Sequence, residues 1–418
     1  MDYNNYNPYR ESNQNNEEEI KQVKRKSMWK GIFIGGGVIL AVSVFFIGCL
    51  LAILIQIGMN GATGKFALGD AAFNKMNELI KYAQDNYLYE VDEEKMEEAI
   101  YDAIFESLDD PYSTYYTAEE YKEIMESTSG VYSGIGVVVQ EDVETGYILV
   151  VEPYENGPAY AEGLRSGDYI VAVEGKDIYG MDINLVVKEI KGEEGTKVNI
   201  TARREGKDFD LTIIRKSIEI KTVDYEMLED NVGYIAVSSF EGTVVDQFKD
   251  AYDALVDEGM TSLVIDIRNN PGGLLTAVTE MLDLFIEEDE MIVYTMDKNG
   301  NKTDYVAKEG VQIKIPCVVL INGNSASASE IFAGALQDYE IAHIMGTQSF
   351  GKGIVQSMLS LRDGSAFKVT IEDYYTPNGN NIHGLGITPD EEVEFDLEAY
   401  NEDGTDTQLE AAIEYLTK

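Results

Sequence analysis

The sequence is poor in the residues on which many enzyme classes depend. Its 418 residues include two cysteines and two histidines. Cys49 lies in an apolar N-terminal stretch and Cys317 at the start of an apolar run typical of a core strand, so we expect no disulfide between them. No Cys and His cluster has metal-ligand spacing, and no His-Glu-x-x-His motif occurs. The sequence therefore predicts neither a metal site nor another cofactor.

Positive charge is scarce as well. The chain has 32 Lys and Arg against 76 Asp and Glu, a formal net charge of −44. Such a surface repels nucleic acid, so DNA or RNA binding is excluded as a function. Because 44% of the residues are hydrophobic, the composition nevertheless indicates a folded chain, long enough for two or three domains.

One segment contains no charge of either sign. Residues 31–58 lack Asp, Glu, Lys and Arg, and about 20 apolar residues suffice to span a bilayer. We expect a transmembrane helix over 31–58, preceded by a disordered tail over 1–30 that is basic from Lys21 to Lys30. Basic flanks stay in the cytoplasm, so the prediction is a single-pass cell-membrane protein with everything after the helix extracytoplasmic. Cleavage after Ala62-Thr63-Gly64 stays open as an alternative.

Residues 66–128 have the apolar periodicity of amphipathic helices. Asp109-Asp110-Pro111 interrupts the pattern, because proline cannot continue a helix. Thr117, with Glu120 three positions later, is typical of a capping box that opens a further helix. This segment is predicted to be an N-terminal helical region.

Residues 130–216 read as a separate small unit of short strands with one helix over 183–190. The glycines of Gly134-Ile135-Gly136-Val137 would let backbone amides converge on an anion. The unit resembles a PDZ domain, which implies that an extended peptide adds a strand and that this loop captures its terminal carboxylate. A glycine bend in a β-module without a ligand is the alternative.

Residues 217–418 alternate strand and helix patterns, which predicts βαβ units, a mostly parallel sheet and a site at strand carboxyl ends. The apolar run 262–267 leads into Arg268-Asn269-Asn270-Pro271-Gly272-Gly273. A turn of this composition at a strand end leaves amide groups free, as stabilisation of an oxyanion requires. A helix-opening turn without a ligand would have the same sequence.

The stretch from 317 to 356 carries the chemistry. An apolar strand runs into Ser325-Ala326-Ser327-Ala328-Ser329-Glu330 and then into a helix. A serine hydroxyl needs a base. His343 lies in an apolar strand and His383 in a Gly/Asn-rich loop, so Lys352, between two glycines, is the stronger candidate. It must be neutral to act, and burial lowers the pKa of a lysine.

Gly346-x-x-x-x-Gly351-Lys352 also approaches a phosphate-binding loop. That motif requires Ser or Thr after the lysine and a helix beyond it, whereas Gly353 and an extended pattern follow here. The sequence therefore argues against nucleotide binding.

The two motifs together resemble the carboxy-terminal processing proteases, also called tail-specific serine proteases. The resemblance covers roughly residues 70–395. It implies that Ser327 is the nucleophile, Lys352 the general base and Gln356 the residue that orients the lysine.

The same resemblance implies an oxyanion hole formed by the amide of Ala328 and a glycine of the 268–273 turn, with Gly273 favoured and Gly272 open. The implied fold is mixed α/β, with a crotonase/Clp-protease-like core, an inserted PDZ domain, an N-terminal helical region and one transmembrane helix.

The resulting hypothesis is a membrane-anchored serine endopeptidase with a Ser-Lys dyad that cleaves proteins near their C-termini after the PDZ domain has captured the tail. Its partners would be peptides with free C-termini, and a homo-oligomer is compatible with its helical ends. A non-catalytic membrane-tethered PDZ scaffold is the main alternative. An acyl-CoA enzyme on a crotonase-like fold is a third, which the PDZ unit and the outward location disfavour.

Overall fold

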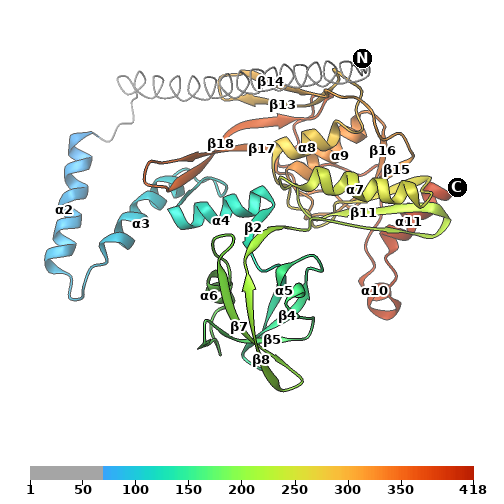
Figure 1. The fold of residues 1–418 in the computed structure, drawn as a ribbon. Coiled ribbons are helices and arrows are strands. Elements are labelled where there is room, and N and C mark those ends of the chain that lie inside the picture. The colour runs from blue at the N-terminus through green and yellow to red at the C-terminus, as the bar shows by residue number, and fades with distance from the viewer. Residues whose placement is uncertain (1–68) are drawn as a thin grey trace, which may run out of the picture. The chain divides into compact units, whose positions relative to one another are not determined.

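The computed structural model describes residues 69–418, which divide into one unit up to residue 93 and a second over 94–418 (Figure 1). The predicted tail over 1–30 and membrane helix over 31–58 lie outside the described residues. Within 69–418, no helix combines the length and apolar character that a bilayer crossing requires.

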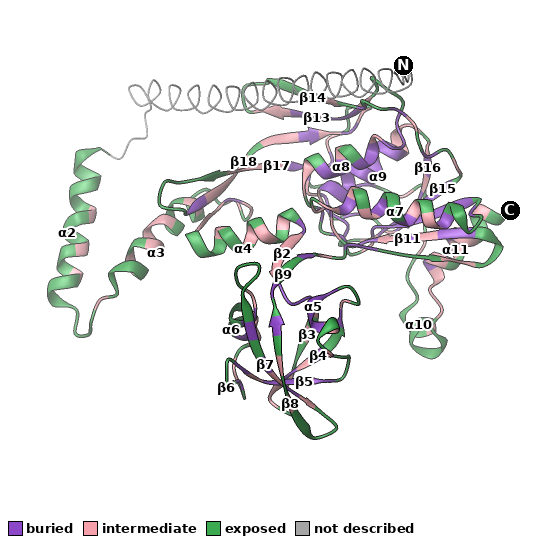
Figure 2. Cartoon of the chain, viewed as in Figure 1, coloured by how far each residue is buried: buried purple, intermediate pink, exposed green. Residues whose placement is uncertain are grey.

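The N-terminal region consists of helices whose side chains are mostly exposed or half-buried, as Figure 2 shows for α2. The capping box that opens α4 is confirmed: Glu120 N–H donates to the Thr117 hydroxyl (3.3 Å), and Thr117 N–H donates to the Glu120 carboxylate (2.9 Å). One strand, β1, interrupts what the sequence indicates as helix alone. The elements are α2 (Asp70–Asn86), α3 (Glu93–Glu106), β1 (Thr114–Tyr116) and α4 (Ala118–Ser129).

The small domain that follows has its own core, which includes Ile148, Leu164 and Ile200. Its sheet has the order β3-β4-β5-β7-β8, with β6 added to β5, so one side of β3 is an open edge. Helix α6 spans the predicted residues. The elements are β3 (Val137–Asp142), β4 (Tyr147–Pro153), α5 (Pro158–Ala161), β5 (Tyr169–Val173), β6 (Lys176–Asp177), α6 (Ile183–Ile190), β7 (Lys197–Arg204) and β8 (Lys207–Ile214).

A two-stranded antiparallel ribbon joins this domain to the rest of the chain. β2 (Val131–Gly134) enters the domain and β9 (Lys216–Glu219) leaves it, with Tyr132 paired to Ile218. Both the approach to the domain and the return from it therefore run through one pair of strands.

The core is built on a six-stranded sheet of order β10-β11-β12-β15-β16-β19. β10 is antiparallel to β11 and the remaining pairs are parallel, as the βαβ pattern predicts. The elements are β10 (Val223–Met227), a 3₁₀ turn (Glu229–Asn231), β11 (Val232–Val237), α7 (Val244–Asp257), β12 (Ser262–Asp266), α8 (Leu275–Leu282), β15 (Cys317–Ile321), α9 (Ala328–Asp338), β16 (Ala342–Gly346), β19 (Glu391–Glu392), α10 (Leu397–Asp403) and α11 (Thr407–Thr417).

A second, antiparallel sheet accompanies the core, and the βαβ pattern did not predict it. Its order is β1-β18-β13-β14, and β17 pairs with β18. β1 reaches this sheet from the N-terminal region, opposite Ala366, Phe367 and Lys368. The remaining strands are β13 (Met291–Asp297), β14 (Lys302–Val306), β17 (Ile354–Ser360) and β18 (Ala366–Tyr375).

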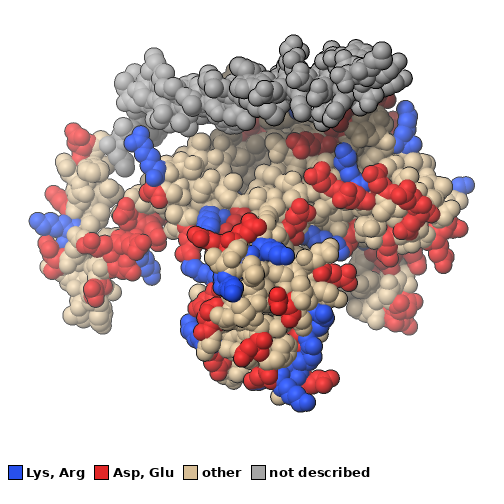
Figure 3. All heavy atoms as spheres, in the orientation of Figure 1, with Lys and Arg blue, Asp and Glu red and all other residues tan. Residues whose placement is uncertain are grey.

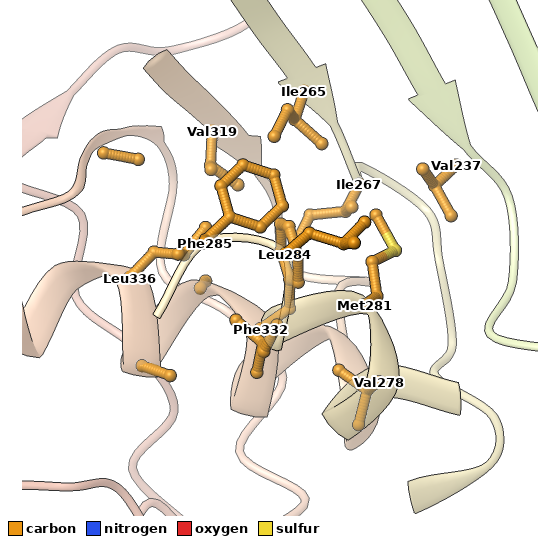
Figure 4. Packing of buried hydrophobic residues seen from close by; sticks show 14 of the residues in the cluster. Val237, Ile265, Ile267, Val278, Met281, Leu284, Phe285, Val319, Phe332 and Leu336 are labelled. Atoms are coloured by element: carbon orange, nitrogen blue, oxygen red, sulfur yellow. The ribbon is translucent and has the colours of Figure 1, made fainter. Parts of the chain in front are cut away.

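Alternating side chains of the central strands fill the two faces of the parallel sheet. Ile265 and Val319 face α8 and α9, where Phe285 and Phe332 meet edge to face at 5.9 Å (Figure 4). The intervening residues, such as Leu320, pack with Ala412 of α11. Full burial of each aromatic side chain stabilises the fold by roughly 1.5–3 kcal/mol. This packing fixes the strand ends from which the site loops emerge.

Candidate active site

Three loops meet at the carboxyl ends of neighbouring strands β12, β15 and β16. Parallel strands place these ends along one edge of the sheet, which is where open α/β sheets carry their sites. The loops are the glycine turn (268–273), the serine turn (322–327) and the lysine loop (347–353).

Backbone hydrogen bonds hold the three loops together. The Ala326 amide donates to the Asn270 carbonyl (3.0 Å), and the Phe350 amide donates to the Ser325 carbonyl (3.0 Å). The buried Ser325 hydroxyl donates to the Ile267 carbonyl at 2.8 Å. The serine turn is thus fixed to the glycine turn on one side and to the lysine loop on the other.

Ser327 is the N-cap of α9 and remains partly exposed. Its backbone has φ 55° and ψ −113°, a conformation that an L-residue adopts at a cost of about 1–3 kcal/mol. Strain of this kind persists only where surrounding contacts impose it. Here the fixed strand end and the helix start force the chain through a sharp turn that leaves Ser327 partly exposed.

The glycine turn lies directly against Ser327. A Cβ built on Gly272 would lie 2.9 Å from both the Ser327 Cβ and the Ala328 amide nitrogen. The Gly272 amide donates to the Asn270 side chain (2.8 Å) and is therefore occupied. Within residues 69–418, the amides of Gly273 and Ala328 donate to no acceptor. The sequence left both Gly272 and Gly273 open as anion-binding donors. The geometry favours Gly273, because its amide is the one that is free.

Lys352 is half-buried in the lysine loop. Burial lowers its pKa from the ordinary value, and the nearby Lys368 ammonium lowers it further, against the opposing carboxylates of Asp110 and Glu330. Its ammonium lies 4.6 Å from the centre of the Tyr112 ring. Burial and Lys368 therefore shift this lysine toward the neutral form that a general base requires, whereas the Tyr112 ring favours the ammonium.

The structure brings the backbones of Ser327 and Lys352 together, but within residues 69–418 no hydrogen bond joins their side chains. Gln356, the expected partner of the lysine, instead donates to the Ile354 carbonyl at 3.4 Å. The side chains of Ser327, Lys352 and Gln356 therefore do not hydrogen-bond to one another in this arrangement. Catalytic hydrogen bonds often form fully only when substrate binds.

Glu330 lies at the centre of this site, although the sequence motifs assigned it no role. Its carboxylate is fully buried and accepts four hydrogen bonds. One oxygen accepts from the amides of Ser327 (2.8 Å) and Lys352 (2.8 Å), and the other from the Ser349 hydroxyl (2.6 Å) and the Gly351 amide (2.6 Å). The carboxylate therefore fixes the positions of the serine and the lysine relative to each other.

Tyr374 of β18 supports the same junction from the second sheet. Its buried hydroxyl lies 2.9 Å from the Ser327 carbonyl oxygen and 2.7 Å from that of Lys352. Burial, with a smaller effect of Glu330, raises the pKa of Tyr374 well above its usual value, so the phenol stays protonated and can donate. For Glu330, the only signal in the sequence was its position three residues after Ser327, which is the spacing of a capping box.

The backbone of His383 packs against the lysine loop, because a Cβ built on Gly353 would lie 2.5 Å from the His383 amide nitrogen, but within residues 69–418 no hydrogen bond joins either imidazole to Ser327 or Lys352. The His343 ring stacks on Tyr415 with centroids 4.2 Å apart, and its Nδ1 lies 3.8 Å from Asp390. The His383 amide donates to the Asn381 side chain (2.7 Å). In the part of the chain that the structure describes, no three His, Cys, Asp or Glu side chains are placed to hold a metal ion.

The predicted carboxylate loop lies where the β2–β9 ribbon enters the small domain. Ile135 points into the domain core with 2% exposure, while Gly136 has φ 72° and packs against Gly157, where a Cβ would lie 3.4 Å from the Gly157 Cα. Val137 begins β3, the edge strand. The loop therefore combines a left-handed glycine with an edge strand that, among residues 69–418, has no neighbouring strand on one side.

This fold and this arrangement define a serine-type peptidase that carries a PDZ domain. The family model "Peptidase family S41" matches residues 231–393, and "PDZ domain" matches residues 149–204.

The chain belongs to the carboxy-terminal processing proteases of peptidase family S41, because it is 37% identical over 327 residues to the carboxy-terminal processing protease CtpA of Bacillus subtilis. That alignment covers 78% of this chain and 70% of the relative. A probable CtpA-like serine protease of Staphylococcus aureus is 34% identical over 90% of this chain and 75% of its own length.

Among solved structures, the photosystem II D1 C-terminal processing protease is similar, with 27% identity and a TM-score of 0.45 over 84% of this chain and 92% of that one.

Proposed function

We propose that this peptidase cleaves proteins near their C-termini with Ser327 as nucleophile and Lys352 as general base. The single observation that carries the proposal is the Glu330 carboxylate, which accepts hydrogen bonds from the amides of both residues. A structural role alone would not require a buried carboxylate to join a strained serine to a lysine whose pKa is lowered.

The reaction follows from these groups. Neutral Lys352 removes the proton from the Ser327 hydroxyl as its oxygen bonds to the scissile carbonyl carbon. The carbonyl electron pair moves onto oxygen, which accepts from the Gly273 and Ala328 amides, each worth roughly 3–4 kcal/mol to the transition state. Collapse breaks the C–N bond, and the Lys352 ammonium gives its proton to the leaving amine. Water, deprotonated by the same lysine, then hydrolyses the ester.

Before Lys352 can remove the Ser327 proton, the lysine side chain must move from the Tyr112 ring to the serine hydroxyl. The Lys352 ammonium now faces the Tyr112 ring, and cation–π attraction of about 0.5–2 kcal/mol favours the charged form there. On binding, substrate would exclude water and bring the amine to the serine. Gln356 would then orient the lysine by a hydrogen bond.

Tail capture would take place on the PDZ domain. The open edge of β3 supports the addition of a peptide strand, and the left-handed Gly136 supports a turn whose amides face an anion. The uncharged stretch 31–58 supports anchoring of the chain in the cell membrane, with the catalytic domain extracytoplasmic.

The test is mass spectrometry of peptides incubated with the full-length chain in detergent. We expect cleavage of peptides with a free terminal carboxylate, slower cleavage of the same peptides with a terminal amide, and no cleavage by Ser327→Ala. Equal cleavage by wild type and Ser327→Ala would refute the assignment. Peptide binding without cleavage by the wild-type chain would favour the non-catalytic scaffold.

The charges around Lys352 predict two opposite shifts in pH dependence. Lys368→Met removes a cation that lowers the Lys352 pKa, so that pKa rises and the acidic limb of kcat/KM moves to higher pH. Asp110→Asn removes a carboxylate that raises it, so the limb moves to lower pH. The exposed Lys298→Met is the matched control and should leave the profile in place. Shifts of both variants in the same direction would contradict the assignment of Lys352 as the base.

A further inference from the structure

A turn from the N-terminal region lies against the proposed general base. The Lys352 ammonium is 4.6 Å from the centre of the Tyr112 ring. Tyr112 comes two residues before β1, whose Thr114 pairs with Lys368 of the second sheet. A segment that precedes the PDZ domain in the sequence is therefore in direct contact with the lysine of the site.

The turn has a fixed position on the second sheet. The Asp110 carboxylate accepts from the Tyr112 amide (3.0 Å) and from the Ser113 hydroxyl (2.5 Å). The hydroxyl of Ser113, a buried residue, accepts in turn from the Thr370 amide of β18 at 3.1 Å. Thr370 lies opposite Gln356, so the turn and the strand that follows the lysine loop are held by the same strand. These contacts, and not the lysine itself, determine where the ring lies.

The ring discriminates between the two protonation states of the amine. Its negative face attracts an ammonium, whereas a neutral amine gains little from the contact. Burial lowers the Lys352 pKa, the Lys368 ammonium lowers it further, and the carboxylates of Asp110 and Glu330 oppose both effects. To these effects the ring adds an attraction that acts on the charged form, which cannot take a proton from the serine.

We propose that Tyr112 is a positioning residue that holds the Lys352 side chain as the ammonium in the resting enzyme, and that substrate binding releases it. The N-terminal turn thereby restrains the general base until a peptide occupies the site. The inference rests on the proposed function in taking Lys352 as the base. Tyr112 acts through that lysine, and the reaction itself uses no group of the tyrosine.

The restraint predicts that removal of the ring makes the free enzyme more reactive. In Tyr112→Leu, the acidic limb of kcat/KM, which reports the free enzyme, should move to lower pH by about 0.4–1.5, the range that loss of a cation–π contact predicts. The acidic limb of kcat, which reports the enzyme–substrate complex, should stay in place, because the lysine has already left the ring there. A purely structural role would not separate the two limbs.

Labelling of Ser327 by diisopropyl fluorophosphate measures the free enzyme directly. With the full-length chain in detergent and no peptide, Tyr112→Leu should be labelled about two- to thirtyfold faster than the wild type at a pH on the acidic limb, and equally fast on the alkaline plateau. The reagent is uncharged, so the many acidic side chains on the surface (Figure 3) do not alter its approach as the pH changes.

Three further variants complete the design. Tyr112→Phe keeps the ring and should restore the wild-type profile. Tyr116→Leu removes a ring from the same segment, but one that lies 5.5 Å from the Lys368 ammonium, and should leave both limbs in place. Tyr112→Met keeps apolar bulk without a ring, and it repeats the test if thermal unfolding shows that Tyr112→Leu is destabilised.

An acidic limb of kcat/KM that stays in place in both ring-deleted variants, or that moves to higher pH, overturns the restraint and leaves Lys352 standing as the base. Slower labelling at every pH does the same, because the ring would then support the reactive geometry. Equal shifts of both limbs would mean that the lysine stays at the ring in the complex, which contradicts its release. A wild-type enzyme that is not labelled on Ser327 overturns both the restraint and the proposed function.

Discussion

Replacement of Lys352 by methionine is expected to lower kcat about 10²- to 10⁴-fold, the range that a positioned general base contributes. Methionine keeps most of the length of the lysine and its apolar stem but has no proton acceptor of comparable strength. Because burial already disfavours the ammonium, its removal should leave the fold intact. Steady-state cleavage of a peptide with a free carboxylate, together with thermal unfolding, measures both quantities.

Lys368→Met is the matched control for this substitution. Lys368 lies close enough to lower the Lys352 pKa, but it belongs to β18, where it pairs with Thr114 of β1. Measured at its own optimum pH, this variant should retain most of the wild-type kcat. A Lys352→Met enzyme that keeps more than a tenth of wild-type kcat would show that another group takes the serine proton.

Glu330→Gln is expected to lower kcat about 100-fold, because displacement of catalytic groups by about 1 Å can cost that much. The reason lies in the donors around the side chain. One carboxylate oxygen accepts from the Ser327 and Lys352 amides, and the other from Ser349 and Gly351. Whichever way a glutamine is oriented, its NH₂ group faces one of these donor pairs and cannot accept.

The same substitution should lower the free energy of unfolding by about 2–4 kcal/mol, as the loss of charge-assisted bonds at a buried site predicts. Urea unfolding and steady-state kinetics measure the two effects separately. Glu280→Gln, on the exposed side of α8, makes the same chemical change and should alter neither. Wild-type kcat in Glu330→Gln would mean that Glu330 does not position the dyad.

Local patterns predicted the elements well wherever periodicity or capping chemistry decides them. Helix α6 spans the expected residues 183–190, and Thr117 with Glu120 caps α4. The S41 family and the PDZ domain were also indicated correctly by short motifs. In these cases the residues that determine the structure are close together in the sequence.

Features that depend on distant residues could not be predicted in this way. Thr114–Tyr116 form a strand because β18 pairs with them. Thr and Tyr favour strands, but a run of three residues is too short to predict one. Asn270 decides which glycine keeps a free amide, since its side chain accepts from Gly272. Glu330 has the spacing of a helix cap, and its role in holding Lys352 becomes visible only once the lysine loop has folded against it.

The predicted partnership of Gln356 and Lys352 remains a prediction. In the described arrangement Gln356 donates within its own strand and Lys352 faces Tyr112. Both side chains are half-buried, Lys352 in the lysine loop and Gln356 in β17. The membrane helix over 31–58 also remains a prediction, outside the described residues.

Labelling with a fluorophosphonate, followed by peptide mapping, tests most directly whether a neutral Lys352 activates the Ser327 hydroxyl. We predict a single adduct on Ser327, a labelling rate that rises with pH along the acidic limb of kcat/KM, and a rate at least 100-fold lower in Lys352→Met. An adduct on another residue, or equal labelling of wild type and Lys352→Met, would contradict the account.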